Sequence, residues 1–379
     1  MSKLETNRLG ILHIIIAVRE TSAPYNEHCL PWAHDRNISI CTYFKSEVSI
    51  PESITLYEGD GSLLGFFRAL RSSLGRQQYH IIHVHSPHLG LLFLLATQFK
   101  HHNIRSSAVV TVHDSYQNFK FRNQLMLLPV FAGFQSVVCC GRASYDSFPK
   151  IYKWFAGDRL TFVQNGVDIE RVDNIVSQQN LSAHKINDLT IVAISRLVDI
   201  KNPFIVVKAF QQSLNGNDNN IGLIYIGEGP LRDDLEETRQ SLGLGNRLEL
   251  TGLIPRDKVF EYLFNADLFI SPSKGEGLPI AVLEAMACRR PVILSDIPPH
   301  REIAKGVDFI PLIPPDDVAG FASEIEKFSK MSISQRSEIG DKCRKLVEDR
   351  FSLPSMHAGY TAIYTQLCGR SMPNLAIAD

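Results

Sequence analysis

The sequence lacks features that would place it in several common classes of protein. Its seven cysteines are an odd number and never form a Cys-x-x-Cys pair, so neither a disulfide framework nor a paired-cysteine zinc site is expected. The formal net charge is only −1, which gives the chain no overall attraction to nucleic acid. We therefore expect reduced thiols and no nucleic-acid partner.

Long apolar runs are also missing. Residues 1–10 are polar, and the apolar run that follows, Ile11–Val18, contains His13 and is too short for a secretion signal. The longest later run, Leu89–Ala96, is far shorter than the roughly 20 residues needed to cross a bilayer. These absences predict a cytoplasmic protein, which could still lie peripherally at the inner face of a membrane.

What the sequence does contain is a regular alternation of short β-rich apolar runs with longer segments of helical pattern. The runs that predict strands are Ile11–Val18, Ile38–Tyr43, Ile81–His85, Val109–Val112, Ser136–Cys140, Leu189–Ser195, Ile221–Ile226, Leu248–Thr251, Leu268–Ser271, Val292–Ser295 and Phe309–Leu312. This alternation predicts an α/β protein in which helices cover both faces of parallel sheets. Because 379 residues are many for one core, two domains are expected.

The boundary between the domains is expected after residue 168. Gln164–Asp168 has turn chemistry, and a polar stretch, Ser177–Asp188, precedes the second set of strands. We expect Rossmann-like domains at residues 1–168 and 169–353, followed by a helix and tail at 354–379 that return to the first domain. Ligands of doubly wound sheets bind beyond the carboxyl ends of the strands, so we expect the two sheets to face an interdomain cleft.

The segment Ser271–Cys288 carries the most chemical information. A strand there ends in a Gly-rich loop, and Pro279 suits the first turn of the helix that follows. The N–H groups of Gly277 and Leu278 would lie at the positive end of this helix, which favours a bound phosphate. Glu284 would point back toward the same ligand, with Glu276 in the loop before it. Both acids could equally be ordinary acids of a helix start and an exposed helix face.

Several segments resemble, in the expected order, those of family 4 retaining glycosyltransferases, which have the GT-B fold. Glu276 and Glu284 have the family's Glu-x7-Glu spacing, and the residues around them are similar to those of bacterial members. The other matching segments are Val112-His113-Asp114, Asn165–Asp168, Ser195-Arg196-Leu197 with Lys201-Asn202-Pro203, Gly227-Glu228-Gly229-Pro230-Leu231 and Thr251-Gly252-Leu253. The resemblance covers most of the chain.

This resemblance implies roles for individual residues. Arg196 and Lys201 would bind the donor diphosphate, Glu284 the ribose hydroxyls and Glu276 the transferred sugar, while His113 would meet the sugar or the acceptor. Glu228, Gly229, Leu253, Gly277, Leu278 and Pro279 would lie beside the donor. Two fixed cations can stabilise the charge that grows on a leaving phosphate, and no Asp-x-Asp motif, the usual clamp for a metal–nucleotide donor, occurs in the sequence. No metal or other cofactor is therefore expected.

Other features leave alternatives open. His83 and His85 share one face of a strand and could bind a metal, but no third ligand is evident, so cleft-lining or core histidines are the preferred interpretation. The turn at Gly227 begins like a dinucleotide fingerprint but has Arg232 in place of the third glycine. The loop after the first strand, residues 19–25, has Ala23 and Pro24 where many relatives have Gly-Gly, which puts phosphate contacts from the first domain in doubt.

These observations predict a metal-independent, retaining hexosyltransferase that uses a nucleotide sugar, UDP-linked in preference to GDP-linked. Its acceptor would be the hydroxyl of a glycan, a lipid-linked sugar or a small molecule. The alternatives are a nucleotide-sugar epimerase of the same architecture and an inactive nucleotide-sugar-binding protein. Peripheral membrane contact through the first domain is a further expectation, for which the candidate basic residues are Arg68, Arg71, Arg76, Lys120 and Arg122.

Overall fold

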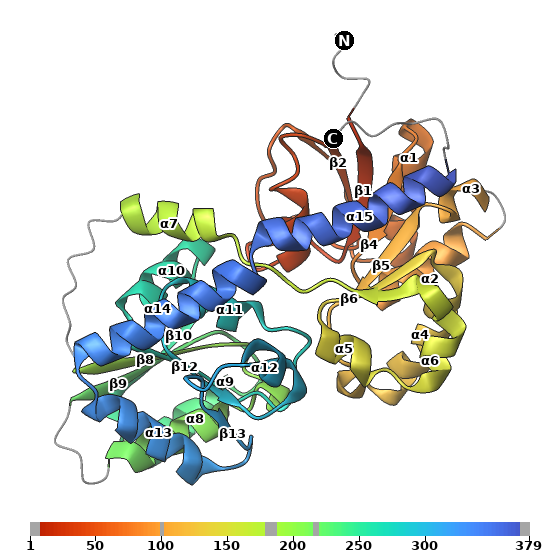
Figure 1. Ribbon diagram of the computed structural model, residues 1–379. Coiled ribbons are helices and arrows are strands. Elements are labelled where there is room, and N and C mark those ends of the chain that lie inside the picture. The colour runs from red at the N-terminus through yellow and green to blue at the C-terminus, as the bar shows by residue number, and fades with distance from the viewer. Residues whose placement is uncertain (1–7, 99–101, 179–187, 215–219, 372–379) are drawn as a thin grey trace. The chain divides into compact units, whose positions relative to one another are not determined.

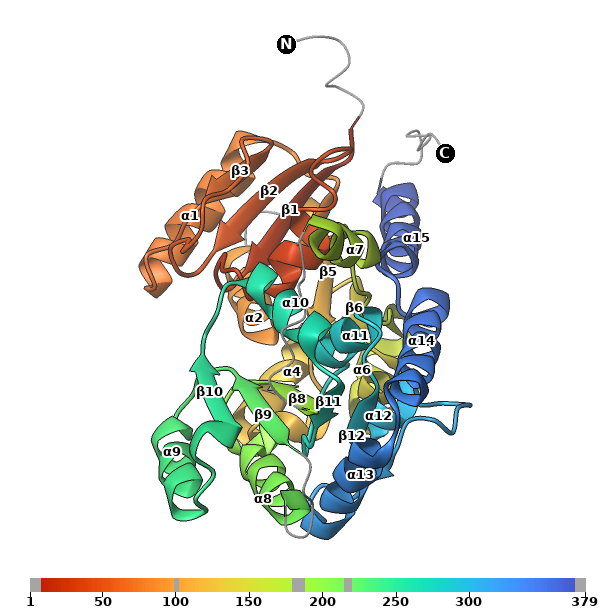
Figure 2. The ribbon, with the colours of Figure 1, turned by 90° about the vertical axis from the view of Figure 1, so that its left-hand side faces the viewer.

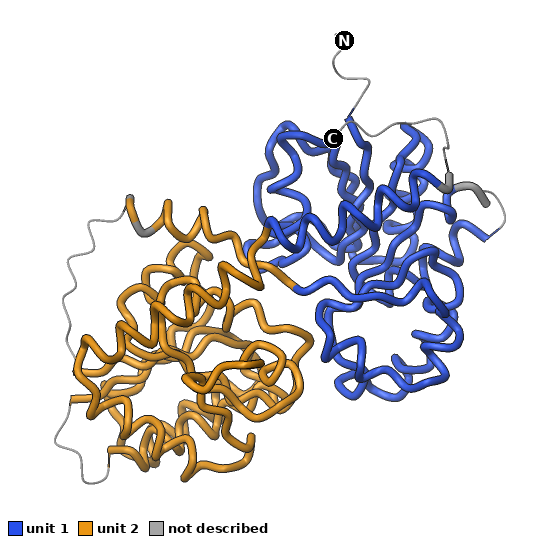
Figure 3. Tube along the Cα trace, in the orientation of Figure 1, with its two compact units in different colours: residues 1–164, 354–379 blue, residues 165–353 orange. Residues whose placement is uncertain are grey.

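The chain folds into two compact units. Unit 1 comprises residues 1–164 and 354–379, and unit 2 comprises residues 165–353 (Figure 3). The computed structural model describes residues 8–98, 102–178, 188–214 and 220–371. Most of the polar stretch expected at 177–188 and of the polar start of the chain lies outside these residues. All seven cysteines are buried free thiols, as expected.

Unit 1 is built on a seven-stranded sheet whose neighbouring strands are all parallel, in the order β3-β2-β1-β4-β5-β6-β7 (Figure 1). The strands are β1 (Gly10–Ile15), β2 (Asn37–Thr42), β3 (Ile54–Tyr57), β4 (Ile81–Val84), β5 (Ala108–Val112), β6 (Ser136–Cys139) and β7 (Leu160–Phe162). Strand β1 lies inside the sheet, where its register pairs His13 with His83 of β4. The alternating pattern did not predict β3 and β7, which are the two edge strands.

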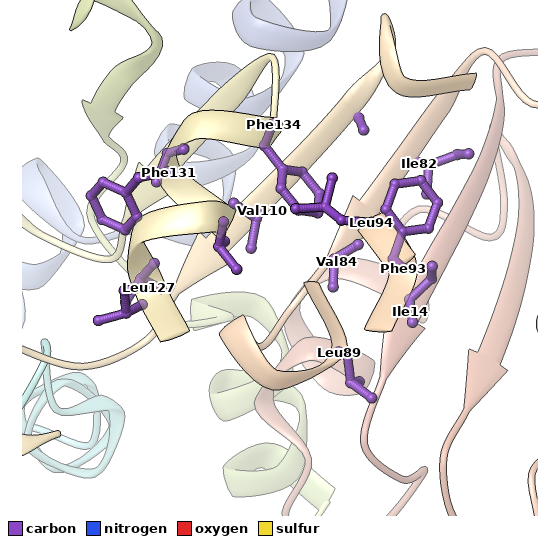
Figure 4. Packing of buried hydrophobic residues seen from close by; sticks show 14 of the residues in the cluster. Ile14, Ile82, Val84, Leu89, Phe93, Leu94, Val110, Leu127, Phe131 and Phe134 are labelled. Carbon is purple, nitrogen blue, oxygen red and sulfur yellow. The ribbon is translucent and has the colours of Figure 1, made fainter. Parts of the chain in front are cut away.

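Helices cover this sheet and bury its apolar side chains. They are α1 (Leu63–Arg76), α2 (Pro87–Ala96), α3 (His102–Arg105), α4 (Phe121–Gly133), α5 (Arg142–Ser147), α6 (Lys150–Ala156) and α15 (Leu353–Ser371), with the short segments η2 (Pro24–Cys29), η3 (Tyr116–Asn118) and η4 (Gly157–Arg159). Phe93 of α2 packs beside Phe134, which follows α4, over Val84 and Val110 of the sheet (Figure 4).

The C-terminal helix belongs to unit 1, as expected. The side chains of α15 that repeat at helical spacing are buried, namely Met356, Tyr360, Tyr364 and Leu367. The tyrosines are also anchored by their hydroxyl groups, because Tyr364 bonds His83 at 2.6 Å and Tyr360 bonds Thr111 at 3.0 Å.

Unit 2 is built on a six-stranded parallel sheet in the order β10-β9-β8-β11-β12-β13. Its strands are β8 (Leu189–Ile194), β9 (Ile221–Ile226), β10 (Leu248–Gly252), β11 (Leu268–Ser271), β12 (Val292–Ser295) and β13 (Leu312–Ile313). The last strand was expected at Phe309–Leu312 and lies further along the chain. Each unit thus has the doubly wound α/β sheet that the alternating pattern predicts.

Helices of unit 2 cover both faces of its sheet. They are α7 (Ile169–Gln178), α8 (Pro203–Leu214), α9 (Arg232–Ser241), α10 (Arg256–Asn265), α11 (Ile280–Ala287), α12 (Pro298–Ile303), α13 (Val318–Lys330) and α14 (Ile333–Arg350), with the short segments η5 (Asp199–Lys201) and η6 (Gly245–Arg247). Side chains of α8, α9 and α13 fill the core on one face, and α10 and α11 lie on the other (Figure 2). A capping box of Ser332 and Gln335 begins α14.

Candidate functional site

Three loops meet at the carboxyl edge of the unit 2 sheet. The loop after β8 is bonded to the loop after β9, since the N–H of Leu197 donates to the carbonyl of Glu228 at 3.0 Å. Gly227, with φ of 146°, donates to the carbonyl of Gly252 at the end of β10. A Cβ on Gly227 would lie 1.9 Å from the carbonyl oxygen of Ser195, so this close approach requires glycine.

Arg196 lies in the first of these loops and is exposed. Among the residues that the structure describes, its guanidinium has no hydrogen bond or ion pair. Glu228 is also exposed and lies 3.3 Å from the guanidinium of Arg232, while Gly229 packs against the backbone of Leu197. Leu253, just beyond β10, is 70% exposed. The edge therefore presents a cation and an apolar side chain to solvent.

Lys201 and Glu276 form an ion pair close to this edge. The Lys201 Nζ lies 2.5 Å from Oε2 of Glu276, and their side chains are 18% and 9% exposed. The hydroxyl of Ser273 donates to the other carboxylate oxygen at 2.7 Å. Asn202, with φ of 55°, turns the chain after η5, and its amide donates to the carbonyls of Pro272 and Pro315 at 3.3 and 2.8 Å. The two loops that carry the pair are thus fixed to each other.

A buried histidine that the sequence analysis missed lies behind this pair. His300 of α12 is fully buried, and its Nδ1 lies 2.9 Å from the carbonyl of Ser295 and 3.0 Å from the Ser295 hydroxyl. That hydroxyl donates to the carbonyl of Ser273 at 2.5 Å. Burial lowers the pKa of His300 to about 4, although the negative charge of Glu276 opposes the shift. His300 is therefore neutral near pH 7 and supports the Ser273 loop.

Glu284 lies in α11 with its side chain only 9% exposed, and it is paired with an arginine. Arg256, at the start of α10, places its Nη2 atom 2.8 Å from Oε1 of Glu284. Sequence reasoning missed Arg256, because nothing in the spacing of the two residues along the chain links them. The buried carboxylate is thus held in one orientation by a fixed cation.

The start of α11 differs in one detail from expectation. Pro279 precedes the helix as its cap residue, with φ of −75° and ψ of 112°, rather than occupying the first helical turn. Gly277 and Leu278 are buried immediately before it, and the amide of Asn165 donates to the carbonyl of Leu278 at 2.9 Å. The N–H groups at the start of this eight-residue helix lie on the chain between the two acids, and such groups favour an anion.

In unit 1, the corresponding sheet edge carries histidines. His113 follows β5 and is partly exposed. Its Nε2 lies 3.4 Å from Nδ1 of His85, whose Nε2 lies 2.9 Å from Nδ1 of His13. The three imidazoles therefore form a chain that runs from the edge into the core.

His83 is a core residue, in agreement with the preferred interpretation of the sequence. Both of its ring nitrogens are bonded to hydroxyl groups, Nδ1 to Tyr364 at 2.6 Å and Nε2 to Thr111 at 2.7 Å. A third histidine does lie near His83 and His85, contrary to the sequence analysis. His13 joins them because β1 pairs with β4, and one ring nitrogen from each of the three lies within 4.8 Å of the others. Hydrogen bonds already occupy most of the ring nitrogens that a metal would need, so these histidines form a hydrogen-bonded imidazole cluster.

Burial keeps these imidazoles neutral. Desolvation is the largest cause that lowers the pKa of His13 to about 3 and that of His85 well below its usual range. The charge of Arg36 lowers the pKa of His13 further, and repulsion between protonated imidazoles would lower that of His85 further. His113 has more contact with solvent, and desolvation lowers its pKa to about 4. His28 of η2, which follows the loop that lacks Gly-Gly, joins the cluster with its ring 4.7 Å from that of His85. At neutral pH the cluster can donate and accept hydrogen bonds without adding charge.

Two family models match the chain, one over each half. Residues 13–171 match the family described as Glycosyltransferase Family 4, and residues 177–346 match Glycosyl transferases group 1. Among curated relatives, the UDP-Gal:alpha-D-GlcNAc-diphosphoundecaprenol alpha-1,3-galactosyltransferase of Escherichia coli is 24% identical over 79% of this chain and 78% of that protein. The phosphatidyl-myo-inositol mannosyltransferase of Mycolicibacterium smegmatis is 23% identical over 71% of this chain and 68% of its own length.

Solved structures show the same architecture. Sucrose-phosphate synthase from Thermosynechococcus elongatus gives a TM-score of 0.78 at 17% identity, covering 95% of this chain and all of that one. Anabaena HepE in complex with UDP and glucose gives 0.73 at 16% identity, covering 94% of this chain and all of that one. The fold is GT-B, as expected. Within the described residues, no helix combines the length and apolar character that a membrane crossing needs.

Proposed function

The chain belongs to the group 1 glycosyltransferases of family 4, and from this premise we propose that it transfers a hexose from a nucleoside diphosphate sugar, with retention of the anomeric configuration. UDP-linked sugars are favoured over GDP-linked ones as donors. The proposed acceptor is the hydroxyl of a glycan or of a lipid-linked sugar.

The observation that carries this proposal is the pair of acids at the edge of the unit 2 sheet. Glu276 and Glu284 are both buried and both held by a cation, Lys201 at 2.5 Å and Arg256 at 2.8 Å. The start of α11 lies between the acids in the chain, and Arg196 at the same edge has no side-chain partner among the described residues. In a nucleoside diphosphate sugar, the pyrophosphate can bind the cations and the start of α11, and the hydroxyl groups can hydrogen-bond the carboxylates.

We assign the roles on this basis. Arg196 and Lys201 would stabilise the negative charge that accumulates on the diphosphate as its bond to the sugar breaks. Glu284, oriented by Arg256, would accept hydrogen bonds from the ribose hydroxyls, and Glu276 would contact the transferred sugar. Because these two cations provide the stabilisation and the sequence has no Asp-x-Asp motif, the proposed reaction needs no divalent metal.

Retention is proposed to follow a front-face course. The bond between the anomeric carbon and the phosphate oxygen breaks, the acceptor oxygen bonds that carbon on the same face, and the acceptor proton passes to the leaving phosphate. His113, neutral at pH 7, can hydrogen-bond the sugar or the acceptor. A double displacement would need a carboxylate nucleophile against the anomeric carbon, whereas Glu276 is engaged by both Lys201 and Ser273.

The relatives support the substrate classes. The Escherichia coli relative is named for UDP-Gal and a diphosphoundecaprenol-linked acceptor, and the Anabaena structure contains UDP and glucose. We extend to this chain a nucleoside diphosphate sugar as the donor, which both suggest, and a lipid-linked or glycan hydroxyl as the acceptor, which the name of the Escherichia coli relative suggests.

The test is a panel of UDP- and GDP-sugars incubated with the protein, with and without a lipid extract as a source of acceptors. We expect one nucleotide sugar to be consumed faster when the extract is present, and NMR of the product to show the anomeric configuration of the donor. Epimerised sugar formed without extract would instead indicate an epimerase. Tight binding of a donor with no turnover under either condition would indicate an inactive binding protein.

A further inference from the structure

Two neighbouring helices of unit 1 expose large apolar side chains that the proposed reaction does not use. On the first two turns of α4, Phe121 and Leu125 are 74% and 52% exposed, and on α6 Ile151, Trp154 and Phe155 are 49%, 75% and 39% exposed. We call these five residues the α4–α6 face. Residues three or four apart share one side of a helix, so each helix presents its members of the set together.

The opposite sides of both helices are fixed in the core. Leu127 and Phe131 of α4 and Tyr152 of α6 are buried in one cluster. The hydroxyl of Tyr152 also donates to the carbonyl of Gln124 at 2.8 Å, which joins the two helices. Because these contacts hold the helices in place, the five apolar side chains cannot turn inward, and the face is a permanent feature of the surface.

Positive charge lies close to the α4–α6 face along the chain. Residues 120–159 contain six Lys or Arg and two Asp, a net charge of +4, whereas the whole chain has −1. Lys120, Arg122 and Lys150 are exposed beside the apolar residues. One of the two aspartates, Asp146, is paired with Arg142 at 2.9 Å. The charge of this segment therefore complements an anionic surface.

The face is also close in the chain to the histidine edge. Helix α4 follows β5 through the loop that begins with His113, and α6 follows β6 through α5. The hydroxyl of Ser144 in α5 donates to the carbonyl of Asp114 at 2.8 Å, which ties this helix to the same loop. Both helices thus leave from the carboxyl edge of the sheet, the edge at which ligands of doubly wound sheets bind.

We propose that the α4–α6 face docks unit 1 on a bilayer that contains anionic lipid. Trp, Phe, Leu and Ile side chains enter the boundary between headgroups and acyl chains, while the exposed Lys120, Arg122 and Lys150 bind the headgroups. The inference deepens the proposed function and rests on it for its purpose, which is to bring the His113 edge to a lipid-linked acceptor. Docking itself requires no catalysis and is measured separately.

Tryptophan fluorescence is the natural assay, because the chain has two tryptophans in opposite environments. Trp154 is 75% exposed and Trp32 is 3% exposed. We expect vesicles of equal parts phosphatidylglycerol and phosphatidylcholine to shift the emission to shorter wavelength and to protect it from acrylamide. Pure phosphatidylcholine should bind at least tenfold more weakly, and 0.5 M salt should weaken binding to the anionic vesicles several-fold. The Trp154→Phe variant should still sediment with anionic vesicles but show no spectral shift.

Substitutions then locate the face. Trp154→Asp and Phe121→Asp should each weaken sedimentation with anionic vesicles at least tenfold, and Lys150→Glu should weaken it several-fold. Leu64→Asp is the matched control, since Leu64 is an equally exposed apolar residue, 69% exposed, on α1 of the same unit. Because all these side chains are exposed, the variants should keep the melting temperature of the parent protein. Equal loss of binding in Leu64→Asp, or none in Trp154→Asp and Phe121→Asp, overturns the assignment of the face.

Failure of docking and failure of the proposed function are distinguishable. If the wild-type protein binds UDP in calorimetry but not anionic vesicles, the docking proposal is wrong and the donor chemistry stands. If it binds vesicles through the α4–α6 face but consumes none of the sugar nucleotides, the proposed function is wrong and the docking stands. Self-association through the face without vesicle binding also refutes docking, because it identifies a protein as the occupant.

Discussion

From the ion pair between Lys201 and Glu276 we predict that stability and catalytic activity respond differently to mutation. We consider Lys201→Met, Glu276→Gln and the double variant. Each single change leaves one charged group, on side chains only 18% and 9% exposed, without its partner at 2.5 Å. The double variant removes both charges, and the oxygen of Gln at position 276 can still accept the Ser273 hydrogen bond. Stability should therefore recover in the double variant, whereas activity should not.

The expected magnitudes follow from burial. Breaking a fully buried pair costs about 3–5 kcal/mol, and because Lys201 keeps some solvent contact we expect about 2–3 kcal/mol for each single variant. For a unit of this size that corresponds to a fall of about 5–10 °C in Tm. The double variant should recover about 2 kcal/mol relative to the sum of the two losses. Turnover by Lys201→Met should fall about 100- to 1000-fold, or about 3–4 kcal/mol, because a preorganised cation at the leaving group is lost.

The assay combines denaturant unfolding of all four proteins with steady-state kinetics on the consumed nucleotide sugar. Lys342 and Glu338 provide the control cycle, since they form an ion pair at 2.8 Å whose side chains are 51% and 69% exposed. That exposed pair should show a coupling of at most about 0.5 kcal/mol and no change in turnover. Additive losses of stability at Lys201 and Glu276 would refute the buried pair, and near-normal turnover by Lys201→Met would remove Lys201 from the site.

The remaining predictions concern the other charged and titratable groups. Arg256→Ala should raise the KM for the donor about tenfold with little change in kcat, because Glu284 loses its orienting cation; a changed kcat with unchanged KM would contradict this. Activity should survive EDTA, and Arg196→Ala should lower turnover about 100- to 1000-fold without lowering Tm; a requirement for added magnesium or manganese would refute the metal-free reaction. Acid should destabilise unit 1 first. The buried histidines have folded pKa values below the unfolded value of about 6.5, about 3 for His13 and about 4 for His300 in unit 2. Their contribution is therefore complete above pH 6.5 and falls with pH by up to about 1.4 kcal/mol per unit for each histidine. Hydrogen exchange at pH 5 and pH 7 should show the greater loss of protection in unit 1, which has four buried histidines among its described residues against one in unit 2; equal loss would refute the account.

The alternating pattern predicted the central strands because their residues are apolar on both faces. Strand β5, for example, is buried throughout. The edge strands β3 and β7 were missed because they are short and partly exposed, four and three residues long, which leaves no continuous apolar run to detect. The same physical reason explains the shift of β13, which has two residues at the other sheet's edge.

The two candidate acids could be identified within one short segment of the sequence, whereas the residues that pair with them depend on how the helices pack. The spacing of Glu276 and Glu284 is visible in the sequence, but Arg256 reaches Glu284 only through the arrangement of α10 and α11. His13 is a different case, since a signal was available. Without β3, His83 and His85 lie on the third predicted strand, which the 2-1-3-4-5 order of doubly wound sheets places beside the first, so a histidine in the first strand could have been paired with them.

The two sheet edges differ in electrostatic character, and this difference limits the roles that His113 could have in the proposed reaction. The unit 2 edge has buried charges that are already paired, whereas the unit 1 edge has imidazoles that burial keeps neutral. Because burial lowers the pKa of His113 to about 4, we expect it to be neutral at pH 7, so in the proposed reaction it would act as a hydrogen-bonding group rather than as a positive charge.

The imidazole chain behind His113 also favours one tautomer. Nε2 of His13 is buried without a partner among the described residues, and a buried unsatisfied N–H is the costlier form of such an atom. If that nitrogen is unprotonated, Nδ1 of His13 donates to His85, and Nδ1 of His85 in turn donates toward Nε2 of His113. His113 then carries its proton on Nδ1, so in the proposed reaction it would offer an N–H donor to a sugar or acceptor hydroxyl.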